Sequence, residues 1–582
     1  MHGTFSTLTT IWRLASPYFR SEDRKAGIIL LVSVIATELS IVAINVMLNQ
    51  WNNRFYNALQ DRNWDNFVSE LLFFCVLAGA YILLAVYQVY LNQWLQIRWR
   101  QWMTKVYLER WLASANHYRM QLLGDAADNP DQRIAEDIQI FVERTLTIGI
   151  GLLSAFVTLG SFVIILWALS EAAPLHAFGS EWAIPGYLVW AALIYALIGT
   201  FFTHLIGWPL VGLNFQQQRY EADFRFNLVR VRENSEQIAL LKGEVAETGR
   251  LLERFSRVAA NWMAIMSRTK RLTFFTAGYS QVSIIFPYVV VSPAYFAGKM
   301  QLGGLMQTAS AFNSVQTSLS FFINVYRSLA EWRSVIQRLD GFNLSVAAAQ
   351  AAAHTPPAIE VDATGTDEAV TLDNVAVRLP DAKPLVAVDH VGLPHGEHVL
   401  VTGPSGSGKS TLFRAIAGIW PFGSGRIAVP KNAKLMMLPQ RPYFPVGTLG
   451  AAIAYPAEPD AYPRERVVEA VTAVGLDGFV SRLDQEAHWN RMLSLGEQQR
   501  LGIARAILQK PDFLFLDEAT ASLDEPSEAR LYRLLQERLP GATIVSIGHR
   551  STLAAFHQRK LALESDGTVH RLRIPALRPA AE

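Results

Sequence analysis

The stretch of sequence that decides the fold reads Gly403-Pro404-Ser405-Gly406-Ser407-Gly408-Lys409-Ser410. It lies between a short apolar run, residues 398–402, and a helix-like run, residues 412–419. A loop in this context binds phosphate groups, because its glycines let backbone N–H groups approach the phosphate oxygens. Lys409 would neutralise the β- and γ-phosphates, and the Ser410 hydroxyl would ligate magnesium. The motif therefore predicts a nucleotide-binding α/β domain.

An acidic motif lies downstream of the loop. Residues 513–516, Phe-Leu-Phe-Leu, have the pattern of a buried strand and lead into Asp517 and Glu518. An acid at a strand tip can hold magnesium, and the next acid can polarise a water molecule. This pair is a weak signal alone, and other motifs surround it: Leu493-Ser494-Leu495-Gly496-Glu497-Gln498-Gln499-Arg500, Ser522-Leu523-Asp524 and His549.

The order and spacing of these motifs resemble the ATP-binding cassette family over the whole soluble domain. The resemblance implies that Gln440 senses magnesium and the attacking water, that Glu518 is the catalytic base, and that His549 contacts the γ-phosphate. Ser494 and Gly496 would belong to the signature loop, which in this family closes over ATP bound to the other subunit. The implied ATP ligands are Gly403, Pro404, Ser405, Gly406, Ser407, Gly408, Lys409, Ser410, Thr411, Ser494, Gly496 and Asp524. The implied magnesium ligands are Ser410, Gln440 and Asp517.

The chain departs from the family pattern at two places. The usual signature has Gly-Gly-Gln where this chain has Leu495-Gly496-Glu497, which adds a bulky side chain and a carboxylate near the nucleotide. We interpret it as a variant signature, because Gly496 keeps one close backbone approach. Many cassettes also stack adenine on an aromatic residue shortly before the phosphate loop. The corresponding residues 375–379 include no aromatic side chain, so no base-stacking residue is assigned.

The N-terminal part of the chain reads as a membrane domain. Six apolar runs are long enough to cross a bilayer as helices, and they cover residues 26–48, 67–90, 145–169, 182–210, 272–297 and 303–330. The first and last of these runs are polar enough to be questioned singly. The composition agrees, because 51% hydrophobic and only 18% charged residues is apolar for a soluble protein. A net charge of +2 gives no broad electrostatic case for nucleic-acid binding.

Lysine and arginine concentrate in two connecting segments, residues 91–143 and 215–271. By the positive-inside rule these segments, both termini and the nucleotide-binding domain are cytoplasmic. Both segments read as helix, so the spans are expected to continue below the membrane. Most of the arginines are interpreted as topology signals and contacts with anionic lipid. The expected domains are a transmembrane domain over residues 1–340, an Ala- and Pro-containing linker over 341–368 and the cassette over 369–582.

The membrane half carries its own resemblance. Its motifs look like the cytoplasmic-loop motifs of the group that joins peroxisomal fatty-acyl half-transporters with bacterial BacA/SbmA-related transporters: Asn129-Pro130-Asp131-Gln132-Arg133-Ile134-Ala135-Glu136-Asp137, Glu221-Ala222-Asp223-Phe224-Arg225-Phe226 and Arg232-Glu233-Asn234. The resemblance implies a multidomain fold: an all-α, six-helix transmembrane domain of the exporter type with domain-swapped helices, followed by an α/β P-loop cassette. It also implies a homodimer and short coupling segments near residues 120–135 and 218–230.

Polar residues recur at helical spacing within the first and sixth spans. They form two stripes, Glu38, Asn45 and Asn49 in the first span and Ser310, Asn313, Thr317, Ser320 and Asn324 in the sixth. Such stripes usually face a bundle interior or a wet cavity. We expect a water-filled cargo cavity, with Glu38 as a group for cargo or protons. The alternative is that the serines and asparagines only bond neighbouring helices.

The resulting expectation is an ATP-hydrolysing transporter in a bacterial inner membrane. It would use ATP and Mg²⁺ to move a hydrophilic cargo such as a peptide or cobalamin by alternating access, and import is favoured over export. Its partners would be a second copy of the chain, membrane lipid and the cargo, with no nucleic acid. A fatty acid or acyl-CoA transporter is the runner-up. An ATP-gated channel or regulator shares the same motifs, and a soluble motor or DNA-repair ATPase conflicts with six spans.

Overall fold

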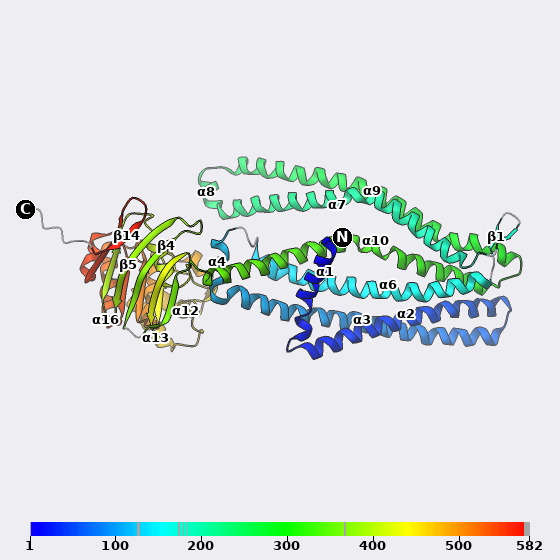
Figure 1. The fold of residues 1–582 in the computed structure, drawn as a ribbon, viewed down its shortest axis with the longest axis horizontal. Helices are drawn as coiled ribbons and strands as arrows, with labels where there is room; N and C mark the ends of the chain where they lie inside the picture. The colour runs from blue at the N-terminus through cyan, green and yellow to red at the C-terminus, as the bar shows by residue number, and fades with distance from the viewer. Residues whose placement is uncertain are drawn as a thin grey trace, which may run out of the picture. The chain divides into compact units, whose positions relative to one another are not determined.

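The computed structural model of the chain describes residues 2–124, 129–172, 175–177, 180–182, 184–365 and 368–574. The chain divides into two compact units (Figure 1). The membrane unit comprises Met1–Leu108 and Asn129–Asp340, and the soluble unit comprises Glu109–Asp128 and Gly341–Glu582. The soluble unit therefore includes a short segment that lies far upstream of it in the sequence.

Helices build the membrane unit. The longer ones are α1 (His2–Ala15), α2 (Arg24–Gln60), α3 (Trp64–Leu112), α6 (Ile138–Ala172), α7 (Tyr187–Glu233), α9 (Glu244–Phe296) and α10 (Leu302–His354), and the short ones are α5 (Pro130–Gln132) and α8 (Ser235–Leu240). The C-terminal ends of α3 and α10 belong to the soluble unit. The shorter elements are a 3₁₀ turn (Tyr18–Arg20), a π-helical turn (Arg133–Asp137) and the hairpin of β1 (Leu175–Ala177) and β2 (Ser180–Trp182). In the described part of the chain, five helical segments are long and apolar enough to cross a membrane, those containing α2, α3, α6, α7 and α9. They correspond to the first five predicted spans.

Aromatic packing joins α7 to α9, which lie side by side in Figure 1. Tyr195 and Tyr279 stack with ring centroids 4.4 Å apart. Each hydroxyl also donates to the backbone carbonyl oxygen of the other tyrosine, at 2.6 and 2.8 Å. A methyl group at Gly199 would lie 2.3 Å from the Tyr279 ring, so only glycine lets the helices approach this closely. Tyr195 also contacts Phe286, which in turn packs against the fully buried Phe312.

The helices differ from the sequence prediction in three places. The sixth predicted span lies inside α10, which is helical throughout. Helix α10 is not among the five segments of the described chain that are apolar enough to cross a membrane. Within this span, the side chains at 322–324, 326–327 and 330 lie outside the described set. The fourth span, expected from residue 182, becomes helical only at Tyr187, because Pro185 and Gly186 (φ 65°) hold the chain in a turn before it. The second coupling segment, expected near 218–230, lies within α7, and the chain reverses later, at α8.

The predicted linker over residues 341–368 is largely regular structure. Helix α10 continues without a break to His354, and β3 (Glu360–Gly365) already belongs to the sheet of the soluble unit. Alanine is the strongest helix former, so the Ala-rich run extends the helix rather than loosening the chain. Pro356 and Pro357 then prevent its continuation. The connection is therefore much shorter than predicted, residues 355–359.

A ten-stranded sheet organises the soluble unit, in the order β3-β7-β4-β5-β14-β13-β6-β12-β11-β8. Its remaining strands are β4 (Ala369–Arg378), β5 (Pro384–Pro394), β6 (His398–Thr402), β7 (Gly423–Pro430), β8 (Leu435–Leu438), β11 (Phe513–Asp517), β12 (Thr543–Ile547), β13 (Arg559–Ser565) and β14 (His570–Arg573). From β13 to β8 the neighbouring strands are parallel. β4 instead pairs antiparallel with both β5 and β7, so the whole sheet is mixed.

The soluble unit also contains helices. They are α4 (Asn116–Leu122), α11 (Lys409–Ile416), α12 (Leu449–Ala454), α13 (Arg464–Ala473), α14 (Trp489–Met492), α15 (Leu495–Gln509) and α16 (Glu525–Arg538), with 3₁₀ turns at Ala113–Ala115, Asp477–Arg482 and Ser551–Phe556. A small pair of strands, β9 (Gly447–Thr448) and β10 (Glu486–Ala487), lies apart from the main sheet. The strands β6, β11 and β12 are almost fully buried, in keeping with the apolar runs at residues 399–401 and 513–516.

Candidate functional site

The glycine-rich loop connects β6 to α11, as its sequence context predicted. Gly408 is the N-cap of α11 with φ 91°, and a Cβ there would lie 2.6 Å from the Val386 side chain, so the position requires glycine. Lys409 is 6% exposed, and its ammonium group donates to the carbonyl oxygens of Gly403 and Pro404 at 2.9 and 2.8 Å. Burial lowers the pKa of Lys409, and the charges of nearby acids oppose this shift. The loop thus holds a cation beside a helix N-terminus, an arrangement that binds phosphate.

The tip of β11 brings an acid to this loop. The Ser410 hydroxyl donates to Oδ1 of Asp517 at 2.8 Å. Burial raises the pKa of Asp517, while this hydrogen bond opposes the shift. A serine hydroxyl, a carboxylate and the amide oxygen of Gln440 are the hard oxygen donors that Mg²⁺ prefers, so the donor chemistry fits this ion.

Glu518 stands at the centre of the three proposed catalytic side chains. Its Oε2 accepts a hydrogen bond from Nε2 of Gln440 at 3.3 Å, and its Oε1 lies 3.2 Å from Nε2 of His549. The backbone of Glu518 has φ 52°, a left-handed conformation that costs energy for a residue other than glycine. The carboxylate remains about one-third exposed. The fold therefore brings all three predicted catalytic residues into contact, with the carboxylate accessible to water.

Helix α15 connects the signature motif to these residues. Ser494 is its N-cap, and Gln499, which is 1% exposed, lies one turn further along. Nε2 of Gln499 donates to the carbonyl oxygen of Gln440 at 3.0 Å, and its Oε1 accepts from the backbone N–H of Ser522 at 3.0 Å. Ser522 precedes Asp524, which caps α16 by accepting from the Ser527 N–H. Gln499 lies within a recognised motif, but this role was not predicted, because its two partners are distant in the sequence.

Arg505 lies further along α15 and was also missed. It donates to the carbonyl oxygens of Tyr443 and Ala452 at 2.9 and 2.7 Å and lies over the Phe444 ring. Burial lowers its pKa to about 10. The residues after Gln440 are thereby fastened to the helix that begins at the signature motif.

Helix α4 packs within the soluble unit. Nη2 of the buried Arg119 donates to the carbonyl oxygen of Gly418 at 3.0 Å, and burial lowers the pKa of this guanidinium. Leu122 packs against the apolar core that includes Phe413 and Trp420. Residues 120–124 of the predicted coupling segment thus belong to the soluble unit, and residues 125–128 lie outside the described part.

The polar stripe of the first span does not form one cavity face. Asn49 is 1% exposed; its Nδ2 donates to the Gln307 carbonyl oxygen at 3.0 Å and its Oδ1 accepts from Gln307 Nε2 at 3.2 Å. Asn53 and Asn57 extend this amide ladder along α2 toward α10. Asn49 is therefore a helix–helix contact and not a cavity residue, because α10 covers its face of α2.

The other two residues of this stripe have different environments. The side chain of Asn45 is exposed. Glu38 is half-buried and accepts a hydrogen bond from Nε2 of Gln88 on α3.

The stripe of the sixth span keeps one face of α10 polar. Asn313 and Thr317 are exposed, and Ser310 and Ser320 are half-buried. Ala311, Phe312 and Val315, on the opposite side, are fully buried in an apolar core with α6, α7 and α9. The side chain of Asn324 lies outside the described set.

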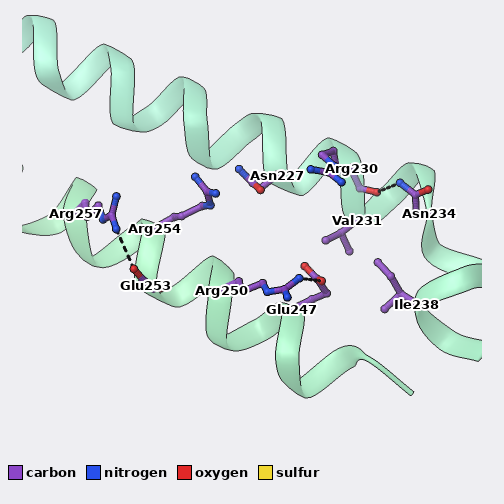
Figure 2. A pocket seen from close by; sticks show the side chains of 10 residues that line it. All are labelled: Asn227, Arg230, Val231, Asn234, Ile238, Glu247, Arg250, Glu253, Arg254 and Arg257. Atoms are coloured by element: carbon purple, nitrogen blue, oxygen red, sulfur yellow. Dashed lines mark hydrogen bonds and ion pairs between the residues drawn. The ribbon is translucent and has the colours of Figure 1, made fainter. Parts of the chain in front are cut away.

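An arginine-lined cleft lies between α7 and α9 near α8, with a volume of about 470 Å³ (Figure 2). Its lining residues are Asn227, Arg230, Val231, Asn234, Ile238, Glu247, Arg250, Glu253, Arg254 and Arg257. Arg250 and Arg257 form ion pairs with Glu247 and Glu253 on their own helix. In Figure 2, Arg254 extends from α9 toward α7. The lining carries four arginines and two glutamates, so the cleft has an excess of positive charge.

An ATP-hydrolysing site of this geometry, in a chain with helices that can cross a membrane, defines an ATP-driven membrane transporter. Two family models match the chain: ABC transporter transmembrane region 2 over residues 14–296, and ABC transporter over residues 388–521. The inner membrane ABC transporter ATP-binding protein YddA of Escherichia coli is 34% identical over 92% of this chain and 94% of its own length. The chain belongs to the ABC transporter family, as an integral membrane protein that couples ATP hydrolysis to transport.

More distant relatives define the group and the fold. The mouse lysosomal cobalamin transporter ABCD4 is 26% identical over 97% of this chain and 95% of its own length. The structure of a bacterial Atm1-family ABC exporter with ATP bound superposes with a TM-score of 0.72 at 19% identity, over 95% of this chain and 94% of that one. These findings confirm the group that the sequence motifs indicated and the exporter-type fold. A single cassette per chain makes it a half-transporter.

Proposed function

We propose that this half-transporter works as a homodimer in a bacterial inner membrane and imports a hydrophilic cargo, such as a peptide or cobalamin, by alternating access. The observation that carries the choice of cargo is the polar face of α10, where Asn313 and Thr317 are exposed opposite a fully buried apolar face. A face of this kind is costly against lipid and suits a wet cavity between two copies. The similarity to ABCD4, a lysosomal cobalamin transporter, supports the same class of cargo.

The contacts of the soluble unit support roles for its residues in hydrolysis. Lys409 would hold the β- and γ-phosphates, and Ser410, Gln440 and Asp517 would hold Mg²⁺. The metal would neutralise charge that develops on the phosphates. Glu518 would accept a proton from the attacking water, since its carboxylate is partly exposed and contacts the His549 imidazole. Gln440 would fix the orientation of that carboxylate through the 3.3 Å hydrogen bond.

Two copies are proposed because one chain carries both halves of a composite site. Glu518 and Lys409 lie on the phosphate side, and Ser494 lies at the N-terminus of α15. If each signature loop closes over ATP on the other subunit, two identical chains complete two sites. Both termini and the cassettes are proposed to be cytoplasmic, on the basis of the lysine and arginine distribution.

Sealed proteoliposomes of known orientation would test the proposal. We expect ATP-dependent accumulation of labelled cobalamin or of a labelled cationic peptide, and we expect Glu518→Gln to abolish it. Flux that survives this substitution would instead indicate an ATP-gated channel. Intact ATPase activity without movement of either cargo would reject hydrophilic transport.

An acyl-CoA transporter is the second candidate function, and the arginine-lined cleft favours it. The phosphates of coenzyme A are anions that arginine binds well. If the cargo is acyl-CoA, we expect it to stimulate ATP hydrolysis, and Arg254→Gln to weaken that stimulation. Lys270→Gln, an exposed charge on α9 outside the cleft, is the matched control. If acyl-CoA stimulates ATP hydrolysis equally in wild type and Arg254→Gln, the cleft gives no support to acyl-CoA as the cargo.

A further inference from the structure

A buried carboxylate joins the two loops that carry the proposed catalytic residues Glu518 and His549. It belongs to Glu528, which lies in the first turn of α16 and is 3% exposed. One of its oxygens, Oε1, accepts a hydrogen bond at 2.6 Å from the hydroxyl of Thr520, in the loop that follows Glu518. The other, Oε2, accepts at 3.2 Å from Nη1 of Arg550, which directly follows His549. The two oxygens of one carboxylate therefore bond to two different loops.

Arg550 makes further contacts across the same two loops. Its Nη1 also donates to the carbonyl oxygen of Leu523 at 2.7 Å, and its Nη2 donates to that of Ala521 at 3.2 Å. The Ala521 N–H donates in turn to the carbonyl oxygen of Glu518 at 3.1 Å. A guanidinium presents its donors in a rigid planar fork, so these bonds fix how the loops lie against each other.

The two proposed catalytic side chains need such contacts because they stand beyond the ends of strands. β11 ends at Asp517 and β12 ends at Ile547. Glu518 has φ 52°, a strained conformation that persists only where the surrounding structure holds it. The His549 side chain is 51% exposed, so packing alone does not fix it. Bonds from outside the sheet are therefore required to keep Oε1 of Glu518 at 3.2 Å from Nε2 of His549.

We propose that Glu528 and Arg550 are positioning residues for ATP hydrolysis, which together hold the Glu518 carboxylate against the His549 imidazole. The inference rests on the catalytic roles proposed above for Glu518 and His549. The pair acts through the two loops and makes no contact with the phosphate loop in the described part of the chain. Its loss should therefore slow the chemical step far more than it weakens ATP binding.

Steady-state ATP hydrolysis by the full-length protein in lipid nanodiscs tests this role. Arg550→Gln removes the charge beside Glu528 and the fork that holds the two carbonyl oxygens. We expect kcat to fall about 30- to 100-fold, because a catalytic group misplaced by about 1 Å costs a rate of this order. The KM for ATP should stay within about threefold of wild type, since the lost contact acts on the transition state.

Arg559→Gln is the matched control. Arg559 is also half-buried, forms an ion pair with Glu397 at 2.8 Å and donates to the carbonyl oxygen of Gly392 at 2.6 Å. It pairs with Val399 near the start of β6, whereas the phosphate loop follows the end of that strand. This substitution should lower the thermal transition and leave kcat unchanged. A kcat for Arg550→Gln equal to that for Arg559→Gln would overturn the proposal.

A double variant separates positioning from stability. Arg550→Gln leaves the Glu528 carboxylate buried without the Arg550 charge, which destabilises the soluble unit. Adding Glu528→Gln removes that buried charge, so the thermal transition should recover toward wild type while kcat stays as low as in Arg550→Gln. A kcat that recovers together with the thermal transition would show a merely structural role and refute the positioning role.

Glu518→Gln, measured in the same assay, tests the premise separately. If it leaves kcat unchanged, the catalytic role of Glu518 fails and this inference fails with it. If it abolishes hydrolysis while Arg550→Gln has no effect, only the positioning role is wrong. The assay contains no cargo, so failure of the hydrophilic-import proposal would leave every result expected here in place.

Discussion

Gln499 offers the sharpest test of how the catalytic residues are positioned. Gln499→Leu keeps the size of this buried side chain but removes both of its hydrogen bonds, to the Gln440 carbonyl oxygen and the Ser522 N–H. Each bond contributes about 1 kcal/mol, and leaving a buried partner unpaired brings the total to about 2–3 kcal/mol. If this loss falls on the transition state, kcat decreases roughly 30- to 150-fold.

The assay is ATP hydrolysis by the purified full-length protein as a function of ATP concentration. KM should stay within about threefold, because Lys409 and the phosphate loop are untouched. Gln509→Leu is the matched control, since Gln509 lies on the same helix and also donates to two backbone carbonyl oxygens, those of Ala454 and Tyr455. A kcat for Gln499→Leu equal to that of Gln509→Leu would refute the positioning role.

Three further predictions concern stability. Asp137, which is 1% exposed, accepts hydrogen bonds from two arginines, so Asp137→Asn should cost about 3–5 kcal/mol and lower the thermal transition in detergent; a shift under 1 °C would contradict it. Gly303→Ala places a Cβ 2.0 Å from the Asn53 carbonyl oxygen and should reduce the yield of folded protein, whereas Gly149→Ala, with open space around it, should not. Burial lowers the pKa of His557, so the unfolded state gains protons first as pH falls below about 6.5; thermal stability should drop over that range in wild type and less in His557→Gln.

The elements that carry the proposed nucleotide site could be predicted from the sequence, because their signals are local. Lys409, Asp517 and Glu518 each belong to a short motif, and the residues next to each motif in the sequence determine its conformation. The strand before the phosphate loop and the strand before Asp517 begin at the residues that their apolar patterns indicated. The mixed sheet was not predicted, because the direction of β4 depends on strands it meets only in the folded domain.

One kind of error arises because periodicity shows which residues share a face of a helix but not what covers that face. Asn49 has the spacing of a cavity residue, yet α10 packs over it and Gln307 takes its amide. The contacts of Gln499 and Arg119 join segments 59 and 299 residues apart in the sequence, and no local pattern announces them. The prediction of the linker was wrong for another reason: its Ala-rich part was expected to be irregular, but it is the helical end of α10.

The contribution of α4 to the soluble unit affects how this protein can be dissected. A fragment that begins at residue 369, where the sequence places the start of the cassette, would lack Leu122 and leave the apolar core around Phe413 partly uncovered. It would also lose the hydrogen bond from Arg119 to the Gly418 carbonyl oxygen, together with the buried residues Phe342 and Val346 at the end of α10. The compact unit that contains the cassette is thus drawn from separate parts of the chain. Nucleotide-binding measurements on an excised cassette would describe a domain that exposes apolar surface covered in the full-length protein.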